Sequence, residues 1–500
     1  MLDLKPASFD DFLREARRGN VVPVVRSVMA DLQTPVGAFM RIAAGARYAF
    51  LLESVEGGER LARYSFLSAN PEMIVRGRGS DTIVEREGKS ELLKNVRPIE
   101  FARSYFKDRE LARRGGLAPL SGGAVGYIGY EAARWFEPVL ETEGDGSAEV
   151  DDAVWMFYRT MLAFDRVRQR IEITSIVLTE EADGSHDRLR ELYQRAVDET
   201  ARIEKVLNSR LPKPREARRV VRDAVFESNW TREEFEAAVR RVQEYITAGD
   251  CYQVVLSQRL SKAVVVDPLQ IYRALRSTNP SPYMFFYRLG DETIIGASPE
   301  MLVRCRGQRL NYRPIAGTRR RGSTETEDWL LGEEMRTDEK EVAEHVMLVD
   351  LGRNDLGRVS DYASVEVEEL MSIERYSHVQ HLVTSLRSRL RSDRDRFDAL
   401  ASCFPAGTVT GAPKLRAMEI IRELEPSTRG VYAGAILYMD YAQNLDSCIA
   451  IRTIAIRDGR AHVQAGAGLV ADSVPELEYE ETVNKARALL RAIELAEKGL

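Results

Sequence analysis

Hydrophobic and polar positions alternate with two different periods along this chain, and the mixture predicts an α+β protein. Short runs of period two that are bounded by Gly, Asn and Pro predict strands, whereas apolar residues three and four apart predict helices. The expected strands are at 48–54, 154–164, 171–178, 251–259, 283–289, 293–297, 309–315, 376–386, 433–439, 447–456 and 461–466. The expected helices are at 187–207, 231–249, 268–277, 338–355 and from 475 to the end of the chain.

Two of the predicted helices carry closely spaced acidic residues. Glu341 and Glu344 are three residues apart and so share one face of the helix at 338–355, and Glu478 and Glu481 repeat this spacing near the C-terminus. The run after Glu344 is almost wholly apolar, which indicates that part of the acidic face is buried. Buried carboxylates need a cation, a proton or hydrogen-bond donors, and Mg2+ held with water and substrate oxygens fits that need. The alternative is an amphipathic helix with solvated acids.

A charged segment with two prolines divides the chain. It reads LPKPREARR at 211–219 and has little to bury. After it, Thr231 and Glu234 form a capping box that starts a helix, and Gly249 suits the end of that helix. We therefore expect an N-terminal domain over 1–210, a linker over 211–227 and a C-terminal domain over 228–500.

A glycine-rich stretch, GGAVGYIGY at 122–130, does not have the GxGxxG spacing of a nucleotide-binding loop. No clear βαβ unit surrounds it either. Glycines inside a strand pattern indicate that another backbone approaches closely. We therefore expect tight packing here rather than phosphate binding.

Composition narrows the class of protein. The chain has 500 residues, is 44% hydrophobic and has a net charge of −6, which argues against nucleic-acid binding through bulk positive charge. The four cysteines are far apart and show no CxxC spacing, so neither a disulfide framework nor a zinc site is indicated. No secretory signal and no membrane span are visible, and we expect a cytoplasmic protein.

Several residues in the second half suggest a site for a small polyanionic carboxylate. Arg452 alternates with apolar residues in SCIAIRTIAI, and an arginine inside a core-like strand needs an anionic partner. Glycine-bearing loops at 317–318, 407–408 and 466–468 can present backbone N–H groups to a carboxylate. The alternatives remain open: these loops can be ordinary turns, Arg452 can form a structural salt bridge, and His381 can be a core histidine.

At these residues the sequence resembles the chorismate-utilising enzymes, and most of all their anthranilate-forming members. The resemblance covers nearly the whole chain. It rests on LLES (51–54), NPSPYMFF (279–286), PIAGTRRRG (314–322), DEKEVAEHVMLVDLGRND (338–355), FPAGTVTGAPK (404–414) and QAGAGLVADSVPELEYEET (464–482). The resemblance implies an antiparallel β-sandwich flanked by helices, with two intertwined domains, of which 228–500 carries the catalytic chorismate site.

Two single positions separate the relatives. Aminodeoxychorismate synthases that use a covalent lysine carry it where this chain has Ala316, and isochorismate and salicylate synthases activate water with a lysine where this chain has Gln253. Glutamine cannot act as a base at neutral pH. A nucleophile that needs no activation, ammonia, fits both substitutions. An aminodeoxychorismate synthase that works without the lysine, and a non-catalytic tryptophan-binding regulator, are the alternatives.

The resemblance implies a lyase reaction in which chorismate and ammonia give aminodeoxyisochorismate, and loss of pyruvate then gives anthranilate, the first step of tryptophan biosynthesis. It implies Mg2+ ligands at Glu344 and Glu481 and a further metal-site acid at Glu478. Glu341 would assist departure of the 4-hydroxyl, and His381 and Thr408 would serve pyruvate elimination. The substrate carboxylates would be bound at Gly317 and Thr318 for the ring, and at Tyr432, Arg452, Gly466, Ala467 and Gly468 for the enolpyruvyl arm.

The resemblance also implies a partner and a regulator. A separate glutamine amidotransferase subunit would supply ammonia, in a heterotetramer. Tryptophan would inhibit by feedback at a second site, to which the N-terminal domain contributes. Its residues would be Glu53, Ser54, Arg63, Pro282, Tyr283 and Met284.

Overall fold

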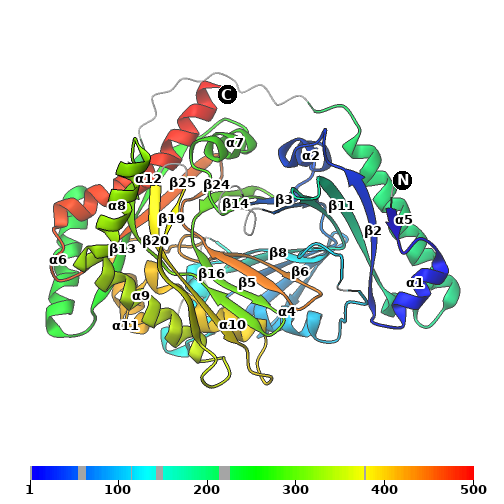
Figure 1. The fold of residues 1–500 in the computed structure, drawn as a ribbon, viewed down its shortest axis with the longest axis horizontal. Coiled ribbons are helices and arrows are strands. Elements are labelled where there is room, and N and C mark those ends of the chain that lie inside the picture. Colours follow the sequence, from blue (N-terminus) through cyan, green and yellow to red (C-terminus); the bar gives the residue numbers. More distant parts are fainter. Residues whose placement is uncertain are drawn as a thin grey trace.

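Two antiparallel sheets form the centre of the computed structural model, which describes residues 3–54, 63–113, 115–141, 150–212, 226–376 and 379–499. The sheets face each other and helices cover their outer sides (Figure 1). The apolar residues between the sheets come from both, with Phe50 and Phe285 on one side and Tyr127 and Met156 on the other. This arrangement confirms the predicted α+β sandwich.

The first sheet has thirteen strands in the described part of the chain. In spatial order they are β1 (Asp3–Lys5), β2 (Val21–Met29), β11 (Arg170–Leu178), β10 (Thr160–Asp165), β4 (Tyr64–Ala69), β3 (Tyr48–Glu53), β14 (Tyr283–Leu289), β15 (Glu292–Ser298), β24 (Thr453–Arg457), β25 (Arg460–Leu469), β13 (Gln253–Ala263) and β12 (Glu227–Ser228), with β21 (Gly411–Ala412) beside β13.

The second sheet has twelve strands over the same described residues. Their order is β18 (Ile315–Arg320), β20 (Val379–Arg389), β17 (Arg309–Tyr312), β16 (Met301–Arg306), β23 (Leu445–Ile449), β22 (Ala435–Asp440), β8 (Gly123–Ile128), β9 (Ala153–Tyr158), β5 (Met73–Arg78), β6 (Asp81–Arg86) and β7 (Lys89–Leu93), with β19 (Glu366–Arg375) beside β20.

Helices bury the outer face of each sheet with their apolar sides. The first sheet is covered by α2 (Pro35–Ile42), α5 (His186–Leu207), α7 (Pro268–Thr278) and α12 (Pro475–Lys498). The second is covered by α4 (Pro98–Lys107), α9 (Glu339–Gly357) and α10 (Arg396–Cys403). Helix α11 (Lys414–Leu424) packs against β13 of the first sheet. The remaining described α-helices are α1 (Phe9–Ala16), α6 (Arg232–Ala248) and α8 (Glu325–Thr337).

Two strands predicted as continuous are each two strands in different sheets, so those predictions were wrong. The run at 154–164 divides at Arg159 into β9 and β10, and the run at 447–456 divides at 450–452 into β23 and β24. A third crossing, at 299–300, joins β15 to β16. Both sides of each crossing are buried, so the apolar pattern continues where the chain changes sheets.

Both sheets combine strands from before and after the predicted linker. β14 pairs with β3 in the first sheet, and β22 pairs with β8 in the second. The two halves are therefore interleaved, as the resemblance implied. Most of the predicted linker, 213–225, lies outside the described residues. The division at 211–227 stays a prediction.

Local predictions hold where a single backbone feature decides them. The Thr231 capping box forms, and Gly249 ends α6 with a φ of 85°. A Cβ added at Gly126 would lie 1.9 Å from the carbonyl oxygen of Val154, which confirms close backbone packing in the stretch at 122–130. Among the helices that the structure describes, none combines the length and apolar character needed for a membrane span.

Candidate functional site

Helix α9 holds the first acidic pair and is fixed at its N-terminus. The Asp338 side chain caps it by accepting the backbone N–H groups of Lys340 and Glu341. Glu341 is partly buried and forms an ion pair with Arg319 of β18, with a nitrogen–oxygen distance of 2.7 Å. Glu344 is accessible to solvent, so the predicted burial of the acidic face holds for Glu341 alone.

The second acidic pair, on α12, lies near the first. The pKa of Glu344 is raised, first by desolvation from the atoms around it and next by Glu341, with Glu481 adding to the effect. Desolvation also raises the pKa of Glu478, and Glu481 again adds to it. Lys485 forms an ion pair with Glu481 at 2.6 Å. The structure therefore brings together four acids that the sequence placed on two separate helices.

The chemistry of these acids fits a hard divalent cation. Carboxylates that repel one another are stabilised by a cation, and carboxylate oxygens are the usual protein ligands of Mg2+. Within the described ranges, however, no three His, Cys, Asp or Glu side chains lie close enough together to form a metal-binding group. Glu481 is held by Lys485 instead.

A bulge in β18 places Gly317 and Thr318 beside α9. Gly317 has a φ of 56°, and a Cβ built there would lie 3.1 Å from the Glu341 carboxylate. His381, opposite Thr318 on β20, has its Nδ1 3.1 Å from both the Thr318 hydroxyl and the Gly317 carbonyl oxygen. Burial lowers the pKa of His381, and the nearby positive charge of Arg452 lowers it further. His381 is therefore a neutral imidazole near pH 7.

Arg452 lies at the crossing between β23 and β24 with a φ of 50°, and not inside a strand as predicted. Its carbonyl oxygen accepts the backbone N–H of Ala297, which holds this conformation. Among the described residues no acid forms an ion pair with its guanidinium, and burial lowers its pKa. The predicted structural salt bridge is thus not made within the described chain, and a desolvated cation is available to an anionic ligand.

Gly466 and Gly468 share one face of β25. Because they have no side chains, Tyr432 and Gln253 can lie close to the backbone there. A Cβ at Gly466 would lie 2.9 Å from the Tyr432 hydroxyl, and one at Gly468 would lie 2.7 Å from the Gln253 side-chain nitrogen. Ala467 points to the opposite face, where it packs against residues of α6 and α11. The structure thus brings Tyr432, Gly466 and Gly468 together, whereas Ala467 has its side chain elsewhere.

Sequence reasoning missed Glu300. It lies in the crossing between β15 and β16, is 7% exposed and has a pKa raised to about 8 by burial. The buried Thr408 hydroxyl lies beside it and lowers that pKa in part, but makes no hydrogen bond of standard geometry among the described residues. The available signal was a single acid inside the apolar stretch GASPEMLV.

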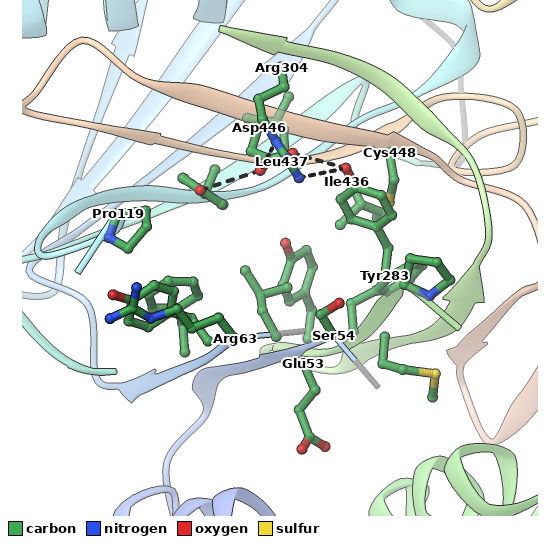
Figure 2. Close-up of a pocket in the computed structure, with 18 of the residues that line it drawn as sticks. Glu53, Ser54, Arg63, Pro119, Tyr283, Arg304, Ile436, Leu437, Asp446 and Cys448 are labelled. Carbon is green, nitrogen blue, oxygen red and sulfur yellow. Dashed lines mark hydrogen bonds and ion pairs between the residues drawn. The ribbon is translucent and has the colours of Figure 1, made fainter. Parts of the chain in front are cut away.

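A separate cavity of about 470 Å3 lies between the sheets and is lined by all six residues of the predicted regulatory site (Figure 2). The Ser54 hydroxyl is buried and has no hydrogen-bond partner among the described residues. Arg63 lies at the cavity wall and pairs with Asp165 at 2.7 Å. Arg304, Asp446 and Tyr283 form a polar network on another wall, with the Arg304–Asp446 pair at 2.7 Å.

Glu53 lines this cavity with its backbone but directs its carboxylate away from it (Figure 2). The carboxylate accepts hydrogen bonds from Tyr272 at 2.7 Å and from Arg276 at 2.9 Å, and Arg166 lies at 3.4 Å. These groups occupy both oxygens. In this structure Glu53 connects β3 to α7, and its carboxylate is not exposed to a ligand in the cavity.

Comparison with known proteins gives a consistent result. The family model described as chorismate binding enzyme matches residues 47–491. Anthranilate synthase component 1 of Acetivibrio thermocellus is 45% identical, with 98% of each chain covered, and that of Synechocystis is 45% identical, with 97% of this chain and 98% of the relative covered. The solved structure of anthranilate synthase component I from Streptococcus pneumoniae aligns with a TM-score of 0.75 and 34% identity, covering 92% of this chain and 98% of that one.

Proposed function

This chain belongs to the family of chorismate-binding enzymes, and we propose that it is the large subunit of an anthranilate synthase, which combines chorismate with ammonia and releases pyruvate. The observation that carries the proposal is the similarity to anthranilate synthase component 1 along almost the whole length of both chains. The site supports it: the four acids of α9 and α12 lie near one another, Arg452 lies near His381, and Gln253 and Ala316 provide no lysine nucleophile or base.

Chorismate carries two carboxylates, and the chain offers a separate position for each. The desolvated guanidinium of Arg452, with Tyr432 and the open backbone at Gly466 and Gly468, suits the carboxylate of the enolpyruvyl arm. Gly317 and Thr318 are placed beside the acidic helix, where the ring carboxylate would lie. This arrangement orients the ring between α9 and the crossing that carries Glu300.

Mg2+ would be held by Glu344 and Glu481, with Glu478 close by. When bound, it would neutralise the ring carboxylate and stabilise charge that develops during ammonia addition. Lys485 would have to release Glu481 for this to happen, because the two form an ion pair here. Desolvation, and next the repulsion by Glu341 and Glu481, raise the pKa of Glu344, and this supports the proposal because a bound cation would offset the repulsion.

The 4-hydroxyl leaves as water when it receives a proton, and Glu300 is suited to donate it. With a pKa of about 8, its carboxyl is protonated at neutral pH. Glu341, the candidate from the sequence, is held in an ion pair with Arg319. His381 is neutral near pH 7 and can accept the proton that is lost when the arm departs as pyruvate. Thr408 lies beside Glu300 at the same site.

The proposed reaction is tested by mixing purified chain with chorismate, Mg2+ and ammonium and detecting anthranilate by its fluorescence. Anthranilate formation supports the proposal. Chorismate consumption without anthranilate would assign the chain to a sister enzyme such as aminodeoxychorismate synthase. No consumption at all would favour a non-catalytic regulator.

We expect the isolated chain to use ammonium but not glutamine. Release of ammonia from glutamine needs an amidotransferase, which we propose is a separate subunit in a heterotetramer. Replacing ammonium by glutamine should therefore remove anthranilate formation to background, and adding an amidotransferase subunit should restore it. Formation of anthranilate from glutamine by the chain alone would contradict the need for a partner.

The cavity between the sheets supports a proposal of feedback inhibition by tryptophan. It has a mostly apolar wall from Phe66, Met284 and Phe285, and the Ser54 hydroxyl has no hydrogen-bond partner in the part of the chain that the structure describes. An aromatic amino acid would place its ring against the apolar wall and its polar groups near the Ser54 hydroxyl. Because linkage is reciprocal, tryptophan must weaken chorismate binding by the factor by which chorismate weakens tryptophan binding.

Replacing Ser54 by Phe should fill part of the cavity and weaken inhibition. We expect the concentration of tryptophan that halves the rate to rise by about 10-fold to 100-fold, the usual range of allosteric coupling, while the rate without tryptophan stays unchanged. The measurement is a tryptophan titration of the ammonium-dependent rate. Ser90→Phe, on the exposed edge strand β7, is the matched control. Unchanged inhibition in Ser54→Phe would contradict the assignment of this cavity as the tryptophan site.

A further inference from the structure

A buried ion pair lies next to Tyr432, one of the residues proposed to bind the enolpyruvyl arm. Arg429 and Glu425 form two parallel hydrogen bonds, from Nε at 2.9 Å and from one terminal nitrogen at 2.7 Å. Their side chains are 1% and 3% exposed. This is the bidentate geometry that an arginine can provide and a lysine cannot.

The remaining N–H groups of Arg429 connect two segments that carry site residues. One donates to the carbonyl oxygen of Val409 at 2.7 Å, directly after Thr408. Another donates to the carbonyl oxygen of Val255 at 2.7 Å, and Val255 lies opposite Gly468 in the β13–β25 ladder. The guanidinium also lies over the Tyr432 ring, 5.7 Å from its centre.

Glu425 contacts the same strand two residues further along. It accepts hydrogen bonds from the backbone N–H and the hydroxyl of Ser257 at 2.8 and 2.7 Å. Ser257 lies opposite Gly466 in the ladder, and its hydroxyl also accepts a bond from Gln464 at 2.9 Å. The pair thus contacts the Tyr432 ring and the residues that adjoin Thr408 and the Gly466–Gly468 segment.

Stability alone does not explain such a pair. Removing two charges from water costs several kcal/mol per ion, and replacing a buried pair by apolar residues of similar volume is often neutral or stabilising. What an apolar replacement cannot supply is the fixed direction of five N–H groups. The advantage of the charged pair is therefore the geometry it imposes on the segments that it connects.

We propose that Arg429 and Glu425 are positioning residues for the chorismate site, acting together. They hold the loop of Thr408 and the glycines of β25 in register around Tyr432, so that the arm of the substrate meets a site already shaped for it. This inference deepens the proposed function and rests on chorismate being the substrate.

The test compares an apolar pair with the native one. In R429M/E425L no unpaired charge is left, but the Ser257 N–H and the Val255 and Val409 carbonyl oxygens lose their partners, so we expect a folded variant with a lower thermal midpoint than the wild type. Its kcat/KM for chorismate should fall by about 100-fold, the cost of a displacement near 1 Å in a positioned site. A folded variant with kcat/KM within threefold of wild type would overturn the proposal.

R429K supplies a second test that does not depend on the apolar pair. Lysine keeps the charge beside Glu425 but cannot bond both carbonyl oxygens and the carboxylate together. We expect the KM for chorismate to rise by about tenfold and pyruvate release to fall behind chorismate consumption, because the arm site and the Thr408 loop are both loosened. Wild-type KM and an unchanged ratio of pyruvate to chorismate would overturn the proposal.

The matched control is R134M/D152L, which removes another buried ion pair that makes none of these contacts. It should leave kcat and KM unchanged. Loss of activity equal to that of R429M/E425L would assign the effect to general packing and overturn the proposal. If the wild type consumes chorismate without forming anthranilate, the proposed function fails, whereas the comparison of chorismate KM values still tests the pair.

Discussion

Glu344→Gln is expected to lower kcat/KM by about a thousandfold or more while leaving the fold intact. Glutamine has the same shape but no charge, and it is a far poorer ligand for Mg2+. A metal ion contributes several kcal/mol of charge stabilisation in the transition state, and each 1.36 kcal/mol is a factor of ten in rate. Because Glu344 is repelled by Glu341 and Glu481, removing its charge should not destabilise the free protein.

The measurement is the rate as a function of Mg2+ concentration, with direct calorimetric titration of Mg2+ and a thermal midpoint for the same sample. The matched control is Asp350→Asn, also on α9, which removes a solvent-exposed carboxylate paired with Arg353. Full Mg2+-dependent activity in Glu344→Gln would refute the metal assignment.

Glu300→Gln is expected to lower kcat by about 100-fold to 10,000-fold, the usual contribution of a general acid. The amide fills the same volume but has no proton to give to the departing hydroxyl. In the wild type the rate should fall as the pH rises past about 8, where Glu300 loses its proton. That alkaline decline should be absent in Glu300→Gln. If the decline persists there and disappears in Glu341→Gln, the acid is Glu341.

The same substitution changes how stability depends on pH. The pKa of Glu300 is about 8 in the folded protein, against an ordinary value of 4.5, so between these values the folded state binds a proton that the unfolded state has lost. Wild-type stability should therefore fall as pH rises from about 4.5 to 8, whereas Glu300→Gln lacks this contribution. Denaturant unfolding at pH 5 and pH 8 gives the free energy of unfolding of both proteins. Between pH 5 and pH 8 the stability of the variant should rise relative to that of the wild type.

The sequence predicted those parts of the site that depend on local spacing. Glu341 and Glu344 are neighbours because of helical geometry, and the Thr231 cap forms because its two bonds are local. Recognisable motifs placed five cavity residues in one group, Arg63 was added as a further contributor, and all six line one cavity. Neither local spacing nor a motif predicts the distance between α9 and α12, because it depends on how the two helices pack.

The sequence could not predict where the chain changes sheets. Arg452 was placed inside a strand because apolar residues flank it on both sides, and those residues belong to two strands in different sheets. Glu300 was missed for the same reason, since its segment follows a predicted hairpin and has no periodicity of its own. The orientation of Glu53 depends on Tyr272 and Arg276, which are distant in sequence.

The interleaving of the two halves has a consequence for how the protein is made. Leu51 of β3 pairs with Phe286, and Val125 of β8 pairs with Tyr438, so these edges stay open on the ribosome until much of the chain has been synthesised. Contacts between such distant residues slow folding, and unpaired strand edges attract other chains. Release of the finished polypeptide, rather than completion of its first half, therefore sets when both sheets can close, and a prematurely terminated chain would be prone to aggregate.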